Sequence, residues 1–109
     1  MSLNKLYTIS WTDLADASYN KELEFIKLKW NTKQVLKFMD LVDNVLSNLE
    51  SGILDGEISK STGIRRLVIS KQTTMFYQIN DNVSQIDILL FWNNKSDSQK
   101  LKEMINTFK

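Results

Sequence analysis

The chain has 109 residues, of which 42% are hydrophobic and 25% are charged, proportions typical of a folded globular protein. It contains no cysteine and no histidine, which excludes disulfides, thiolate metal sites and histidine-based catalysis, so we expect neither a metal nor a small-molecule cofactor. The formal net charge of +1 does not by itself indicate a nucleic-acid-binding protein.

The length predicts a single domain over residues 1–109. No apolar run approaches the roughly 20 residues that span a bilayer, and Met1–Lys5 lacks the basic and apolar regions of a secretory signal. We therefore expect a cytoplasmic protein without membrane contact.

The first half of the chain predicts a strand followed by two helices. Leu6–Trp11 is apolar and β-branched, and Ser10 or Thr12 can cap a following helix. Apolar residues spaced by three and four predict a helix over Leu14–Trp30. A second helix, capped by Thr32, carries a stronger apolar stripe, formed by Val35, Phe38, Met39, Val42, Val45, Leu46 and Leu49. The short connection predicts an antiparallel helical hairpin whose stripe belongs to the core, with Trp11 and Trp30 fixing the first helix to the sheet.

The second half predicts a loop, three strands and a helix. Residues 51–63 hold all three glycines and form the longest loop. Three β-type segments follow with short connections that favour antiparallel hairpins: Ile64–Ser70, Thr73–Asn80 and Gln85–Trp92. In the last of them Ile86, Ile88, Leu90 and Trp92 are expected on one face and Leu89 and Phe91 on the other, which indicates a central strand covered on both sides.

An amphipathic segment with Leu101, Met104, Ile105 and Phe108 predicts a C-terminal helix. The predicted class is α+β: a two-helix hairpin on a small antiparallel sheet, in the order β-α-α-β-β-β, with a short C-terminal helix.

Four short motifs carry a resemblance to a known family. They are Ile9-Ser10-Trp11 with Ala15, Gly63-Ile64-Arg65-Arg66-Leu67-Val68, Met75-Phe76-Tyr77-Gln78-Ile79, and Leu89 to Lys95 followed by Leu101. Their order and spacing resemble the RelE/ParE toxin superfamily over nearly the whole chain. The resemblance implies a toxin of a type II toxin–antitoxin, plasmid stabilisation-like system, which binds a cognate antitoxin and poisons either DNA gyrase or ribosome-bound mRNA.

The same resemblance separates the possible activities. In its mRNA-cleaving branch, basic side chains of the three-strand meander hold the scissile phosphate, often with a tyrosine, histidine or glutamate. This chain has Thr73 and Thr74 where the cleaving enzymes place an arginine, and Asn93, Asn94 and Lys95 in place of an arginine or histidine. We therefore favour an antitoxin-binding toxin that acts on gyrase or translation. The alternatives are a ribosome-dependent mRNA endoribonuclease and a non-toxic interaction module that has lost the target surface.

Candidate contact residues lie mainly in the basic second half. Residues 58–79 contain Lys60, Arg65, Arg66 and Lys71 without any acidic residue, whereas residues 40–57 contain five acidic residues and no basic one. This segregation predicts either one cationic face or ordinary solvated surfaces. The expected target or nucleic-acid contacts are Lys60, Arg65, Arg66, Lys71, Asn94 and Lys95.

Arg65 is the foremost of these, since a guanidinium can hold phosphate or carboxylate in a bidentate manner, although it can also pair with an acidic side chain. Candidate catalytic residues for an endoribonuclease are Arg65, Lys71, Tyr77 and Lys95. Tyr77 could donate a proton or stack on a base, but its alternation with Met75 and Ile79 equally suits the core.

Overall fold

The structure is a computed structural model that describes residues 6–108. Met1–Lys5, inspected above for a signal sequence, lies outside the described residues. The elements in chain order are β1 (Thr8–Trp11), α1 (Asp13–Lys29), α2 (Thr32–Glu50), β2 (Glu57–Ile58), β3 (Arg65–Val68), β4 (Thr73–Asn80), β5 (Gln85–Asn93) and α3 (Ser98–Asn106). Within residues 6–108, no helix is long and apolar enough to cross a bilayer.

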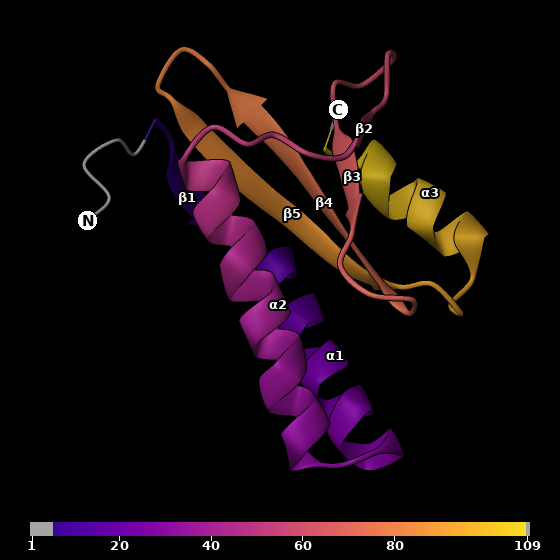
Figure 1. The fold of residues 1–109 in the computed structure, drawn as a ribbon. Coiled ribbons are helices and arrows are strands. Elements are labelled where there is room, and N and C mark those ends of the chain that lie inside the picture. Colours follow the sequence, from indigo (N-terminus) through magenta and orange to yellow (C-terminus); the bar gives the residue numbers. More distant parts are fainter. Residues whose placement is uncertain (1–5, 109) are drawn as a thin grey trace.

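The strands form one sheet in the order β1-β5-β4-β3-β2. Strands β2 to β5 pair antiparallel, whereas β1 pairs parallel with β5. Figure 1 shows the α1–α2 hairpin beside one face of this sheet and α3 on the other side. The α+β class, the helical hairpin, the meander and the C-terminal helix are thus confirmed, with the difference that the sheet is mixed and has a fifth strand.

Helix α1 is joined to the sheet through its N-cap. The hydroxyl of Thr12 accepts a hydrogen bond from the Ala15 N–H at 3.0 Å and donates one to the Leu89 carbonyl at 3.0 Å. One side chain therefore caps the helix and provides a hydrogen-bond donor for a backbone carbonyl of β5. At α2 the cap is Asn31, whose Oδ1 accepts from the Gln34 N–H at 3.0 Å, so the cap expected at Thr32 lies one residue earlier.

The larger core lies between the helical hairpin and the sheet. Phe38, Val42 and Leu49 of α2 are buried there with Met75, Tyr77, Ile86 and Ile88 of the sheet, which confirms the core role of the α2 stripe. Trp11 stacks on Phe91 at 5.4 Å between ring centroids and meets Tyr19 edge-on at 5.3 Å. Trp11 therefore fixes α1 to the sheet, as expected. Trp30 follows the last turn of α1 and is 47% exposed, and it lines a small hollow together with Ser70 and Gln72 of the β3–β4 turn.

A smaller core lies under α3 and depends on a β-bulge. The β4–β5 register shifts between Phe76 and Tyr77, so that Phe76 pairs with Leu90 while Tyr77 pairs with Ile88. The extra residue, Leu89, changes the alternation of β5. Phe91 therefore joins Ile86 and Ile88 in the larger core, and Leu90 joins Leu89 in the smaller one. The regular alternation expected over Gln85–Trp92 ends at Ile88, although the expected coverage of both faces is confirmed.

The loop over residues 51–63 contains β2, which the sequence did not predict. Glu57 pairs with Arg66 and Ile58 pairs with Arg65. The chain can approach β3 this closely because Gly56 has a φ of +114°, and a Cβ there would lie 2.8 Å from the Arg66 carbonyl oxygen. The loop therefore adds a short edge strand to the sheet, while residues 55–61 stay exposed.

Candidate functional site

Two adjoining hollows lie on the side of the sheet that carries α3. The first, of about 460 Å³, is lined by Glu57, Ile58, Ser59, Ser61, Thr62, Ile64, Arg66, Phe76, Leu101, Lys102, Ile105 and Asn106. The second, of about 270 Å³, is lined by Arg66, Thr74, Phe76, Trp92, Asn94, Ser96, Ser98 and Leu101. They share Arg66, Phe76 and Leu101. We call the two together the α3-side groove.

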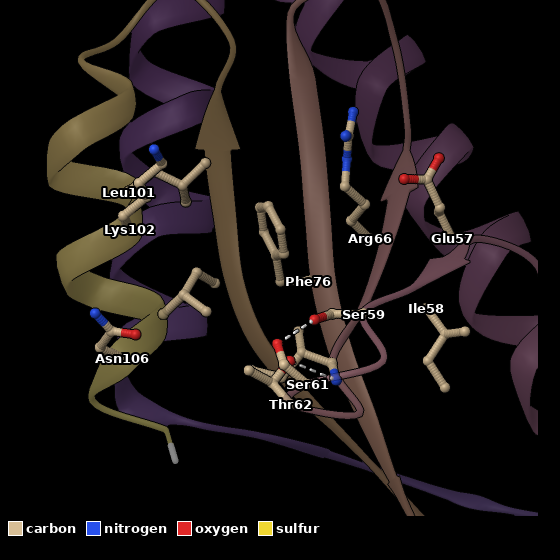
Figure 2. A pocket seen from close by; sticks show the side chains of 12 residues that line it. Glu57, Ile58, Ser59, Ser61, Thr62, Arg66, Phe76, Leu101, Lys102 and Asn106 are labelled. Carbon is tan, nitrogen blue, oxygen red and sulfur yellow. Dashed lines mark hydrogen bonds between the residues drawn. The ribbon is translucent and has the colours of Figure 1, made fainter.

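The first hollow has an apolar floor and polar walls. Figure 2 shows Leu101, Lys102 and Asn106 of α3 on one side, Glu57, Ser59 and Ile58 on the other, and the Phe76 ring between them. Ser59 and Ser61 hold the loop together through their hydroxyl oxygens, 3.2 Å apart. This combination of an apolar floor and scattered polar groups suits contact with another macromolecule.

Arg66 belongs to the groove because of its register on β3. It lies opposite Phe76 of β4, whose side chain packs under α3, whereas Arg65 lies opposite Tyr77, which packs under the helical hairpin. The two neighbouring arginines therefore face opposite sides of the sheet. Arg66 is exposed and, among residues 6–108, forms no ion pair, so its guanidinium is available to an external carboxylate or phosphate.

Tyr77 lies outside the groove. Its ring is fully buried in the larger core, and its hydroxyl donates a short hydrogen bond to the Asp55 carbonyl. Burial raises the pKa of the Tyr77 phenol; Arg65 opposes this rise and Asp55 adds to it. The phenol is thus a buried donor with a partner from the loop, on the opposite face from Arg66.

Asn94 is fixed at the end of the second hollow. Its Oδ1 accepts from the Thr74 hydroxyl at 2.8 Å, and its Nδ2 donates to the Lys71 carbonyl at 3.1 Å. Its backbone N–H donates to the Gln72 carbonyl at 2.7 Å. These bonds connect the turn after β5 with the β3–β4 turn, and Trp92, opposite Thr74, forms an aromatic wall beside Asn94.

The remaining predicted contacts are spread around this surface. Lys60 is exposed between Ser59 and Ser61 at the rim of the first hollow. Lys71 is exposed on the β3–β4 turn, joined to Asn94 through its backbone. Lys95 lies near Lys29 of α1, whose pKa it lowers through a side-chain hydrogen bond and charge repulsion. The structure thus brings Arg66 and Asn94 together, sets Lys60 and Lys71 nearby, and separates Arg65 and Tyr77 from them.

Several lining residues were not among the predicted contacts. Phe76, Leu101 and Ser98 contribute to the groove, and Thr74 was considered only as the position of a missing arginine. The pairing of β4 with β5 could have identified these residues. It places Thr74 opposite Trp92, on the side of the sheet that the apolar stripe of α3 covers. In the part of the chain that the structure describes, no group of three or more Asp or Glu side chains could hold a metal ion.

Comparisons with known proteins identify this architecture. No family model and no curated protein match the sequence. Among solved structures, a chain of the chromosomal ParDE TA system from P. aeruginosa is 16% identical, with a TM-score of 0.66, covering 83% of this chain and 98% of that one. The E. coli toxin RelE, as a mutant in the free state, is 12% identical, with a TM-score of 0.61, covering 94% and 98%.

A chain of the toxin–antitoxin complex RelBE2 from Mycobacterium tuberculosis is 15% identical, with a TM-score of 0.52, covering 81% of this chain and 98% of that one. At such low identities the similarity establishes the fold alone, which this chain shares with these three solved structures. The resemblance read from the four sequence motifs is therefore confirmed at the level of the fold.

Proposed function

We propose that this chain is the toxin component of a type II toxin–antitoxin system, formed by one domain over residues 1–109. In this proposal it is neutralised by a cognate antitoxin and acts in the cytoplasm on DNA gyrase or on translation. The supporting observation is the RelE/ParE fold, shared over 83% of the chain with a structure described as a ParDE TA system and over 81% with one described as a toxin–antitoxin complex.

The chemistry of the α3-side groove favours action by contact over RNA cleavage. The groove offers the Arg66 guanidinium, the Lys102 ammonium, amides, hydroxyls and two aromatic rings, and Glu57 is the only carboxylate among its described lining residues. Cleavage needs a proton-transfer group beside the cations, and the buried Tyr77 hydroxyl, bonded to Asp55, is poorly suited to that role. We therefore assign target contact to Arg66 and Asn94, with Lys60 and Lys71 at the rim.

Two cell-free reactions test this proposal. The purified chain is added to a bacterial translation reaction and, separately, to a DNA gyrase supercoiling reaction. We expect one of the two to be inhibited in a dose-dependent manner, and the inhibited reaction identifies the target. A folded chain that inhibits neither reaction contradicts the toxin assignment and favours a non-toxic interaction module.

The translation reaction also tests the endoribonuclease alternative. Primer extension on the mRNA recovered from an inhibited reaction reveals any new 5′ ends. Contact alone predicts full-length mRNA with inhibited synthesis. Ribosome-dependent cleavage sites would contradict the contact mechanism and establish the nuclease.

A further inference from the structure

A buried carboxylate, that of Glu22, lies on α1. Glu22 is only 5% exposed, although it carries a charged side chain. Its Oε2 accepts a hydrogen bond from the buried Thr73 hydroxyl at 2.5 Å, and Glu22 forms no ion pair with any of residues 6–108. Burying a carboxylate without a nearby cation is unfavourable. We therefore expect a positively charged group from outside the chain to pair with Glu22.

The second carboxylate oxygen of Glu22 is the one open to a ligand. Every fully buried side-chain nitrogen and oxygen among the described residues has a hydrogen-bond partner. Oε1 has none within residues 6–108. The small exposed fraction of Glu22 therefore includes Oε1.

Glu22 lines a cavity of about 200 Å³ between α1, β5 and α3. Its other walls are mainly apolar, with Leu14 from α1, Leu90 and Trp92 from β5, and Met104 from α3. This volume is below the roughly 300–1,000 Å³ of pockets that enclose drug-sized ligands. It suits one long side chain, and we call it the Glu22 cavity.

From these features we infer that the Glu22 cavity receives an arginine side chain of a partner polypeptide. The carboxylate complements the guanidinium, and the apolar walls complement the three methylene groups of the arginine stem. A guanidinium also stacks on an aromatic ring such as that of Trp92, which favours arginine over lysine. The hydroxyl of Ser96, which lines the same cavity, can accept a further N–H.

The surroundings of the cavity favour a polypeptide over a free cation. Lys21, Trp92, Ser96 and Met104 line both the Glu22 cavity and a broader hollow of about 670 Å³. The main chain of a partner can lie in this outer hollow while one of its side chains enters the cavity. The inference does not depend on toxin activity. The Glu22 cavity shares Trp92 and Ser96 with the α3-side groove, but Glu22 and its other lining residues lie outside that groove.

Lys21 is the nearest internal competitor. It lines the cavity mouth, but it is exposed, and as the immediate neighbour of Glu22 on a helix it points in a different direction. Its positive charge repels an entering guanidinium. Lys21→Ala is therefore expected to tighten arginine binding about twofold, given the modest strength of exposed charge interactions.

The test is an NMR titration of the ¹⁵N-labelled chain with N-acetyl-arginine-methylamide. We expect saturable shifts of the amides of residues 90–93, and binding about tenfold or more weaker in Glu22→Gln, because a charge-assisted hydrogen bond is lost. Glu22→Gln keeps the shape of the side chain and an acceptor for Thr73. Glu24→Gln, an exposed change on the same helix, is expected to bind like the wild type, and capped citrulline, which is neutral, is expected not to bind.

Two further probes make the result decisive. Met104→Trp fills the cavity from α3, outside the contacts of Glu22 with Thr73, and is expected to abolish the shifts even if Glu22→Gln fails to fold. Butylguanidinium tests whether the cavity prefers a free cation to an arginine side chain. Binding of capped arginine at least as tightly as butylguanidinium supports a polypeptide partner. Binding of butylguanidinium alone, equal binding to Glu22→Gln, or the absence of saturable shifts with the wild type would each overturn the inference.

Discussion

The two arginines of β3 face opposite sides of the sheet because they are neighbours on a strand. Arg65 is half-buried, faces the helical hairpin and lies opposite the buried Tyr77. Arg66 faces α3 and connects the two hollows of the groove. Composition and local charge could not distinguish them, since the pattern around residues 63–68 predicts a strand without specifying which face the helices cover.

This difference predicts opposite effects for two matched substitutions. Arg66→Ala should weaken inhibition of the target reaction about tenfold or more, since a charge-assisted contact is lost, while stability stays nearly unchanged. Arg65→Ala should leave inhibition unchanged and lower the free energy of unfolding by about 1 kcal/mol through lost packing of its stem. Dose–response curves and urea denaturation measure the two quantities. Loss of inhibition in Arg65→Ala alone would reverse the assignment.

The buried phenol of Tyr77 predicts a pH dependence of stability. Folding raises the pKa of Tyr77, chiefly through burial. Below the ordinary tyrosine pKa of about 10 the phenol is neutral in both states and its stabilisation is fully present. Above that pH the unfolded chain loses the proton first, so the free energy of unfolding falls as pH rises through the folded-state value.

Tyr77→Phe should reduce this alkaline fall and should also cost about 1 kcal/mol at neutral pH, because the hydrogen bond to Asp55 is lost. Urea denaturation between pH 8 and about 11 measures both effects. Tyr19 contributes in the same direction, since burial and Asp43 raise its pKa, so Tyr19→Phe is the matched comparison. An unchanged alkaline slope in the double variant would contradict this explanation.

At the scale of elements, the sequence predicted long regular segments better than short or irregular ones. The helices of the hairpin follow from apolar spacing, although α2 begins at Thr32, the residue expected to cap it, because Asn31 supplies the cap. The two-residue strand β2 left no periodic signal, because it exists through pairing with β3. The bulge at Leu89 depends on how β5 aligns with β4, which the sequence of β5 alone does not determine.

Gly56 is the residue on which the β2–β3 pairing depends most directly. Gly56→Ala should lower the free energy of unfolding by about 1–3 kcal/mol, because it combines a strained backbone with a clash. Its new Cβ would lie 2.8 Å from the Arg66 carbonyl oxygen, whereas a Cβ at Gly63, with a φ of +76°, would meet no atom within 4 Å. Gly63→Ala should therefore cost less, about 1 kcal/mol. Equal losses in urea denaturation would contradict the close approach at Gly56.

At the scale of the whole molecule, the candidate site depends on contacts between distant segments. The α+β class and element order could be predicted locally, but the parallel pairing of β1 with β5 joins residues 8–11 to residues 85–88. The groove likewise joins β3, the turn after β5 and α3. Of the predicted contact residues, Arg66 and Asn94 meet in the groove, whereas Arg65 lies on the other face because strand alternation and helix placement together decide its direction.

The proposed toxin role predicts that this chain arrests growth and that an adjacently encoded antitoxin relieves the arrest. The most direct measurement is the growth rate of bacteria after induction of the chain alone, compared with co-induction of the neighbouring reading frame. We predict arrest in the first culture, normal growth in the second, and a complex of the two proteins on purification. Normal growth despite abundant folded chain in the first culture would contradict the account.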